Sequence, residues 1–313
     1  GYFLGKKIYS KRASEVSWEG AFRESSLDLL KRYKSIFPYL FLSTLIGFTV
    51  QCIVYYRTPG AVLTAMEYLV GDFLLVQNFF FPVQSATGVV WYLGAMLFAI
   101  WLLYPLMRRH WHAFLYAAPV ITCAITGILL NQCGSLNAPD EQLFGWVNSG
   151  FLRAVSAISA GVFLFALNHF LHEDMTQDHL SFRGRCAVTI LEIFLYLYVF
   201  YHMYAFTDGY GLADGTALFA MCVAFLCTVS GESFLYGRFD NAFCRFLGHF
   251  TMPLFLNHYY WVRNMGALFD LLGIPHSGVV TYGTAFFLSF VTSALVLIFG
   301  KQIKKIRLAG LFL

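Results

Sequence analysis

Long apolar stretches recur along this chain and are separated by short segments that contain Pro, Gly or charged side chains. A helix needs about 20 apolar residues to cross the hydrocarbon core of a bilayer, and its backbone polar groups must bond internally there. Each long stretch is therefore predicted to be a membrane-spanning helix. The predicted spans are 36–56, 89–107, 113–130, 151–171, 186–205, 211–231, 246–266 and 279–300.

One apolar stretch, residues 66–82, does not fit this pattern. It is shorter than the others and contains Glu67 and Asp72, two carboxylates that are costly to place in lipid. We expect it to be an interfacial or re-entrant segment.

The polar segment 1–34 precedes the first predicted span and is expected to lie in the cytoplasm. Ser25 and Ser26, followed by Asp28, are typical of a helix N-cap and predict a short basic helix that leads to Pro38. The chain begins at Gly1 without a methionine, so we also expect a further segment upstream.

Composition supports a membrane protein. The 313 residues are 58% hydrophobic and 12% charged, whereas about a quarter of the residues in a soluble domain are charged. The fold class predicted for residues 1–313 is a single all-α, polytopic transmembrane helix bundle. The net charge of +4 lies in short loops, where it sets orientation, so no nucleic-acid partner is expected.

The distribution of basic residues predicts the orientation of the chain. Placing the loops on alternate sides puts all but three of the 21 Lys and Arg residues on one side, together with both ends of the chain. The three exceptions are Arg57, Arg153 and Arg263. Cytoplasmic loops carry the excess of Lys and Arg, which predicts that both visible ends are cytoplasmic.

Three ionisable residues within the predicted spans are candidates for function, because such residues usually face a cavity or a partner. His258 lies in the middle of a span beside Asn257, Glu192 lies within an otherwise apolar span, and His202 lies near the outer end of that span. A neutral His258 bonded to a neighbouring helix is the structural alternative. His202 is interpreted as an interfacial residue.

Two polar clusters remain. Lys31, Arg32 and Lys34 precede the first span and fit either a cytoplasmic phosphate site or an anchor for anionic lipid headgroups. A second cluster contains histidines and carboxylates without a regular metal-ligand spacing, so no metal is predicted. Its members are His169, His172, Glu173, Asp174 and His179. His110 and His112, beside Arg108 and Arg109, are interpreted as a solvated turn.

Motifs along nearly the whole chain, taken together and in order, resemble those of the acyltransferase-3 family of bacterial membrane acyltransferases. The matching motifs are Gly1-Tyr2-Phe3-Leu4, Lys31-Arg32-Tyr33-Lys34 running to Pro38-Tyr39, Trp91-Tyr92-Leu93-Gly94 with Tyr104-Pro105-Leu106, Leu152-Arg153-Ala154 with Gly161, and Leu247-Gly248-His249-Phe250-Thr251 running to Phe255-Leu256-Asn257-His258.

The resemblance implies a ten-helix protein of the bacterial cytoplasmic membrane, with two spans upstream of Gly1. It implies an enzyme, an O-acyltransferase that moves an acyl group, usually acetyl, from cytoplasmic acetyl-CoA to a hydroxyl of a cell-envelope glycan. The expected catalytic histidine, preceded by an arginine, would lie in the missing first span. This chain is therefore expected to lack its principal catalytic group.

The resemblance also implies roles for residues of this chain. Lys31, Arg32 and Lys34 are expected to bind the phosphates of acyl-CoA, which is a co-substrate rather than a bound cofactor. Membrane lipid, the acyl-CoA donor and the hydroxyl acceptor are the expected partners. Trp91, Arg153 and His258 are expected to line the cavity, with His258 the candidate catalytic residue among those visible. Glu192 joins this set because it is an ionisable residue within a predicted span.

Three positions depart from the family pattern. Ser35 replaces the second arginine of the basic motif, Met96 stands where one subgroup has a glutamate, and Phe255 replaces a tyrosine. Two other functions stay open. A transporter or flippase for a glycan or lipid-linked precursor would use the same polar cavity, and a non-catalytic scaffold would not need it. Dependence on acetyl-CoA distinguishes the enzyme from the transporter. An unchanged cellular phenotype in Arg32→Ala and His258→Ala would favour the scaffold.

Overall fold

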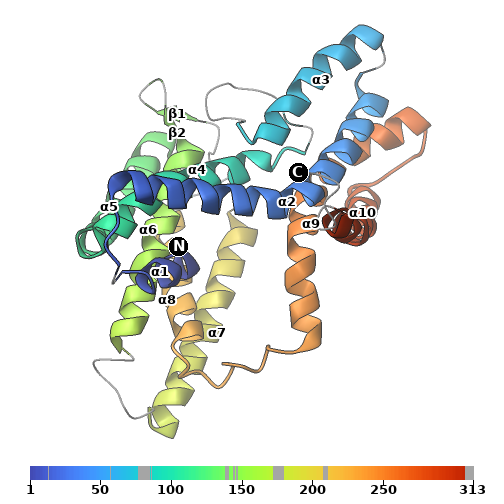
Figure 1. Cartoon of the computed structure of the whole chain (residues 1–313). Coiled ribbons are helices and arrows are strands. Elements are labelled where there is room, and N and C mark those ends of the chain that lie inside the picture. The colour runs from blue at the N-terminus through green and yellow to red at the C-terminus, as the bar shows by residue number, and fades with distance from the viewer. Residues whose placement is uncertain are drawn as a thin grey trace. The chain divides into compact units, whose positions relative to one another are not determined.

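A computed structural model describes most of the chain. The residues it describes are 1–12, 14–56, 58–76, 85, 87–137, 141–143, 145, 147–171, 180–206 and 211–306. Contacts group the chain into two compact units (Figure 1). Unit 1 comprises Gly1–Leu29 and Ala95–Asp240, and unit 2 comprises Leu30–Gly94 and Asn241–Leu313. The predicted single membrane domain stays a prediction.

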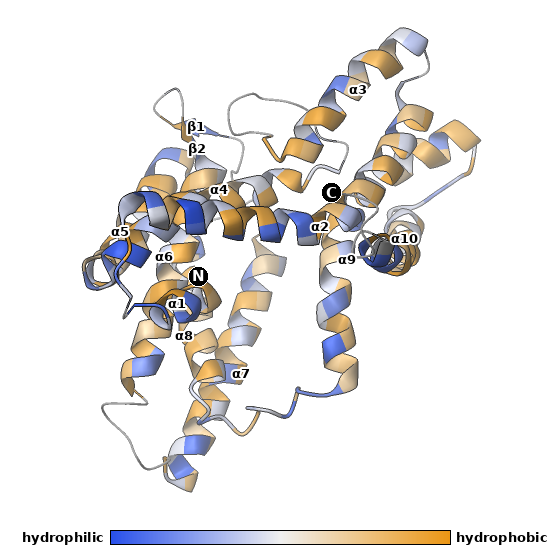
Figure 2. Ribbon diagram, viewed as in Figure 1, coloured by the Kyte–Doolittle hydropathy of each residue, from blue (hydrophilic) through white to orange (hydrophobic). Residues whose placement is uncertain are grey.

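Seven of the described helices are long and apolar enough to cross a membrane, which confirms the all-α polytopic class. Figure 2 shows hydrophobic residues along most of their length. These helices are α2 (Trp18–Val54), α4 (Val90–Arg109), α5 (Trp111–Cys133), α6 (Ser149–Phe170), α7 (Phe182–Ala205), α8 (Leu212–Val229) and α10 (Gly278–Ile306). The protein is therefore a multi-pass membrane protein.

The remaining predicted span, 246–266, forms most of α9 (Ala242–Leu272), which is not among these seven helices. The helix is long enough to cross a bilayer, but polar residues such as His249, His258 and Arg263 interrupt its apolar sequence. The eight-span prediction is thus supported at seven positions, and at the eighth the structure shows a long helix of mixed polarity.

The start of α2 differs from the sequence prediction. The helix begins at Trp18 and continues through Pro38, so Ser25 and Ser26 lie inside it rather than at its cap. Ser17 accepts a hydrogen bond from the backbone N–H of Gly20 at 3.1 Å and occupies the position of the N-cap. The prediction of a separate short helix was wrong because a polar helical segment and an apolar span follow one another without a break.

The segment predicted to be interfacial or re-entrant also begins earlier than expected. Helix α3 covers Pro59–Leu74, and the Thr58 side chain caps it by accepting a hydrogen bond from the backbone N–H of Ala61. A proline in the first turn favours this start because it already has a helical φ angle. Part of the predicted stretch, 77–82, lies outside the described residues.

Unit 1 is built around the short helix α1 (Tyr2–Tyr9), which packs on α6. Leu4 and Ile8 of α1 are buried with Val162 and Phe165 of α6. The unit also contains two further helix pairs, α5 with α6 and α7 with α8. A short antiparallel hairpin of β1 (Gln142–Leu143) and β2 (Val147–Asn148) leads into α6.

Unit 2 contains α3, α9 and α10 together with the C-terminal part of α2. Helices α9 and α10 pack along their length, and Trp261 donates a hydrogen bond to the Thr292 hydroxyl at 3.1 Å. Helix α10 also approaches α2 closely, since a Cβ atom on Gly300 would lie 2.5 Å from the ring of Tyr39.

Candidate functional site

A buried histidine and a buried aspartate meet where α7 ends and α8 begins. His202 lies in the last turn of α7, and Asp214 lies in the first turn of α8, where the helix dipole favours a negative charge. Nε2 of His202 lies 2.9 Å from Oδ1 of Asp214. Only 7% of His202 and 8% of Asp214 is exposed. The two residues form a buried, hydrogen-bonded pair in unit 1.

The second oxygen of Asp214 is fixed by the loop that follows α5. The Ser135 hydroxyl donates to Oδ2 at 2.9 Å, and the backbone N–H of Leu136 donates to the same atom at 2.8 Å. The loop is held in place by a hydrogen bond from the Gly211 N–H to the Gly134 carbonyl at 3.0 Å. Both carboxylate oxygens are thus satisfied, which lowers the cost of burying the charge.

This arrangement orients the His202 ring. With Nε2–H donating to Asp214, the neutral imidazole carries its lone pair on Nδ1. Nδ1 has no hydrogen-bond partner among the described residues. His202 also lines a cavity. A carboxylate that holds one ring nitrogen of such a histidine is the arrangement that positions it to bind or deprotonate a hydroxyl.

The cavity beside this pair has a volume of about 340 Å³. Arg153, in the second turn of α6, lines it together with His202 and Asp214, so three helices contribute titratable side chains. Ligand cavities often combine a few such groups with an apolar wall. The other lining residues are Leu136, Asn137, Met203, Phe206 and Ala217.

Glu192, a predicted cavity residue, lies elsewhere on α7. Its Oε1 atom accepts a hydrogen bond from the Thr228 hydroxyl at 2.7 Å, and the Tyr196 hydroxyl lies 2.9 Å from the same threonine oxygen. Ten residues along a helix correspond to about 15 Å, so Glu192 is well separated from His202. The structure places Glu192 in a polar contact between α7 and α8, with its Oε2 atom unpartnered among the described residues.

His258 and Trp91 belong to unit 2. Nδ1 of His258 lies 3.1 Å and 2.9 Å from the carbonyl oxygens of Leu254 and Phe255 in its own helix, α9. His258 lines a largely apolar cavity of about 520 Å³ between α9 and α10. Trp91 makes an edge contact with Tyr92, whose ring in turn contacts Phe255. Of the four predicted cavity residues, only Arg153 lies beside the histidine–aspartate pair.

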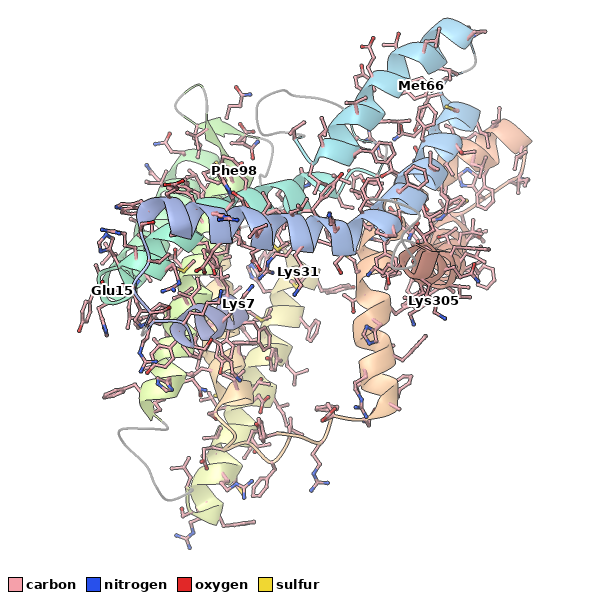
Figure 3. All side chains as sticks on the ribbon, viewed as in Figure 1. Lys7, Glu15, Lys31, Met66, Phe98 and Lys305 are labelled. Carbon is pink, nitrogen blue, oxygen red and sulfur yellow. The ribbon has the colours of Figure 1, made fainter. Side chains whose placement is uncertain are left out.

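Two segments that lie far apart in sequence and carry basic residues are in contact in unit 2. Nζ of Lys304 on α10 lies 3.4 Å from the Ser35 hydroxyl and 4.4 Å from the centre of the Tyr39 ring on α2. Figure 3 labels Lys31 on α2 and Lys305 near the end of α10. We call the basic residues on these two contacting helix segments the basic cluster: Lys31, Arg32, Lys34, Lys301, Lys304 and Lys305.

A second basic site lies in unit 1, where the sequence predicted only a solvated turn. Arg12, Arg108 and Arg109 line a cavity of about 520 Å³ together with two aromatic residues, Tyr9 and Trp111. Arg108 donates to the backbone carbonyl and hydroxyl of Ser14, and the Arg109 guanidinium donates to the carbonyl of Val16. Arg108 and Arg109 therefore hold the segment before α2 in place. His112 also lines the cavity.

No metal site is predicted from the sequence, and this stays a prediction. In the part of the chain that the structure describes, no group of three or more His, Cys, Asp or Glu side chains could hold a metal ion. His169 contacts the hydroxyl of Tyr9. The other residues of its sequence cluster lie outside the described residues: His172, Glu173, Asp174 and His179.

Comparison of the sequence and the structure with protein-family models, curated proteins and solved structures gives no match. The resemblance to the acyltransferase-3 family stays a prediction from the motifs. The site must therefore be interpreted from its own geometry.

Sequence reasoning missed Asp214 and Ser135, and it interpreted His202 only as an interfacial residue. One signal was present, because Asp214 is an acidic residue inside a predicted span, 211–231, and such residues usually have a partner. Its contact with Ser135 joins positions 79 apart in sequence, and no local pattern predicts that contact.

Proposed function

We propose that this protein is an integral-membrane O-acyltransferase of the bacterial cytoplasmic membrane. It moves an acyl group, acetyl in the simplest case, from cytoplasmic acyl-CoA to a hydroxyl of a cell-envelope glycan, and both visible ends of the chain lie in the cytoplasm. The observation that carries the proposal is the basic cluster, in which Lys304 of α10 contacts Ser35 and Tyr39 of α2.

The basic cluster fits a donor that carries several phosphate groups. Lysine and arginine bind phosphate oxygens through charge-assisted hydrogen bonds, and a set of cations on neighbouring helices can bind more than one phosphate. The Tyr39 ring attracts the Lys304 ammonium by a cation–π interaction and fixes its position. Lys304 thus offers a cation at the position where Ser35 replaces the second arginine of the family motif.

The proposed reaction is transfer of an acyl group from a thioester to an alcohol. The acceptor hydroxyl oxygen forms a bond to the thioester carbonyl carbon, and the C–S bond of acyl-CoA breaks. The hydroxyl proton passes to a base and then to the CoA thiolate. Such a reaction needs a positioned base and donors for the developing oxyanion.

The proposal is tested by measuring CoA binding to the full-length protein in nanodiscs of neutral phosphatidylcholine. The double variant Lys31→Gln/Lys304→Gln removes one cation from each helix and is expected to weaken CoA binding by about tenfold or more. Arg183→Gln is the matched control, because it removes an exposed cation of unit 1. CoA affinity that is equal in the double variant, the control and the wild type would contradict the proposed donor site.

The main alternative for the basic cluster is contact with anionic lipid headgroups. It predicts that the protein binds no CoA and that the double variant weakens only its interaction with phosphatidylglycerol. A transporter or flippase likewise would neither bind CoA nor release it from acetyl-CoA in the presence of the acceptor.

A further inference from the structure

The cavity at the turn between α4 and α5 in unit 1 combines three arginines with two aromatic residues. We call it the arginine cavity, after Arg12, Arg108 and Arg109, and its volume is about 520 Å³. Tyr9 and Trp111 also line it, and the described residues around it include no aspartate or glutamate. A ligand inside the cavity therefore meets cationic and aromatic groups without a competing carboxylate in the wall.

Two of the arginines keep N–H groups for a ligand. Arg12 donates a hydrogen bond to the carbonyl of Tyr9 at 3.3 Å, and its guanidinium carbon lies 3.4 Å from the centre of the Tyr9 ring. Arg109 donates to the carbonyl of Val16 at 3.0 Å. A guanidinium has five N–H donors, so each of these two groups can also bind a ligand.

The carboxylates nearby do not offset the charge of Arg12 and Arg109. Glu24 lies 3.1 Å from Nζ of Lys11 and 3.5 Å from Nε of Arg108, so it already has two cations of its own. The carboxylates that follow along the chain, at positions 15 and 19, are exposed and line no part of the cavity. In the part of the chain that the structure describes, no carboxylate forms an ion pair with Arg12 or Arg109.

Trp111 adds a neutral donor to the wall of the cavity. Only 6% of this residue is exposed, and its indole N–H forms no hydrogen bond with a described residue. A buried tryptophan N–H usually has a partner, and a ligand oxygen can supply one here. Guanidinium and indole donors together suit an anionic group with several oxygens, such as a phosphate.

The position of the cavity in the chain indicates where its phosphate comes from. Helix α4 ends at Arg109 and α5 begins at Trp111, so one residue, His110, separates two membrane-spanning helices. Such a short turn lies where the spans leave the hydrocarbon core, at the depth of the lipid headgroups. The basic end of α4 is predicted to face the cytoplasm, and the cytoplasmic leaflet carries anionic lipids.

We propose that the arginine cavity binds the headgroup of an anionic phospholipid, with Arg12 and Arg109 on the phosphate oxygens. The lipid would then link the segment after α1, which carries Arg12, to the end of α4, which carries Arg109. The inference goes beyond the proposed function and does not depend on it, because the acyl-CoA phosphates are assigned to the basic cluster in unit 2.

The first experiment compares two lipids with the same acyl chains on the full-length protein. Native mass spectrometry measures the dissociation constants of phosphatidylglycerol, which is anionic, and of phosphatidylcholine, whose choline cation the arginines repel. We expect phosphatidylglycerol to bind about tenfold more tightly or better. Equal affinities for the two lipids would overturn the proposal.

A pair of double variants locates the lipid. Arg12→Gln/Arg109→Gln is expected to weaken phosphatidylglycerol binding by about tenfold. The matched control, Arg183→Gln/Arg238→Gln, removes the same charge from exposed positions of unit 1 and should change the affinity by less than about twofold. Gel filtration checks that both variants are folded. Equal weakening in the two double variants would show that overall charge, and not this cavity, binds the lipid, which overturns the proposal.

Two competitors separate a lipid from other sources of phosphate. Inorganic phosphate and CoA are each added to the wild type with bound phosphatidylglycerol, and we expect neither to displace the lipid. Displacement by inorganic phosphate would assign the cavity to a free phosphate. Displacement by CoA that is lost in Arg12→Gln/Arg109→Gln would assign it to the acyl donor. Either result overturns the lipid site.

Discussion

Gly161 of α6 lies directly against the backbone of Gly1, since a Cβ atom on Gly161 would lie 2.6 Å from the Cα atom of Gly1. Small residues permit such close approach between chain segments in membrane proteins. This contact holds α1 against the core of unit 1. A larger side chain at Gly161 should therefore lower the stability of the protein.

Gly161→Val is expected to lower the free energy of unfolding by about 1–3 kcal/mol, because the new side chain overlaps the Gly1 backbone. The measurement is the thermal unfolding temperature of the protein purified in detergent. Gly127→Val in α5 is the control, since a Cβ atom there meets nothing within 4 Å. Equal losses in the two variants would show that helix propensity, and not the contact, sets the effect.

The buried His202–Asp214 pair should matter far more for stability than an exposed pair of the same type. Asp214→Asn leaves one of the donors around Oδ1 and Oδ2 unpaired and is expected to cost about 1–3 kcal/mol. Asp270→Asn is expected to cost less than about 0.5 kcal/mol. Asp270 lies 3.2 Å from Nε2 of His276, and its side chain is 77% exposed, against 9% for Asp214.

A comparison of the two unfolding temperatures checks this expectation. A similar small loss in both variants would contradict the assignment of Asp214 as the residue that fixes the His202 ring.

Thr228 links Glu192 to Tyr196 between α7 and α8. Thr228→Val removes the hydroxyl from this contact and is expected to cost about 1–3 kcal/mol, because the buried carboxylate loses its described partner. Thr64→Val is the control, since the Thr64 hydroxyl bonds the carbonyl of Gly60 in its own helix and is exposed. The measurement is the free energy of unfolding of both variants by denaturant in mixed micelles. Equal decreases in Thr228→Val and Thr64→Val would contradict a stabilising contact between Thr228 and Glu192.

Much of the helical architecture could be predicted from the sequence. Apolar runs of about 20 residues located seven helices that can cross a membrane, because the bilayer makes length and hydropathy strong signals. Helix ends were less predictable. The start of α2 at Trp18 lies 18 residues before the predicted span, since a polar helical segment outside lipid has no hydropathy signal.

The candidate site was predicted less well than the fold. His202 and Asp214 are both visible as polar residues in apolar runs, but their contact depends on how α7 and α8 pack. The contact of Lys304 with Ser35 joins residues 269 positions apart and has no local signal. The sequence shows which residues are ionisable and whether they are acidic or basic. It does not show which of them contact one another in the folded protein.

Binding at the basic cluster should depend strongly on salt. Raising NaCl from about 0.1 M to about 1 M shortens the Debye length from about 10 Å to about 3 Å, which screens exposed charges. We expect the CoA affinity of the wild type to fall over this range and that of Lys31→Gln/Lys304→Gln to fall less. Isothermal titration measures the CoA affinity of both proteins at the two salt concentrations. An equal decrease in affinity for the wild type and the double variant would mean that the basic cluster does not contact the phosphates.

Acyl transfer itself is the central claim. Full-length protein in liposomes is supplied with labelled acetyl-CoA and with glycan from the envelope of the producing cell, and both free CoA thiol and label in the glycan are measured. We predict that CoA is released only when the glycan is present and that the label appears as an ester on the glycan. Transport of unlabelled glycan with no release of CoA would contradict the account.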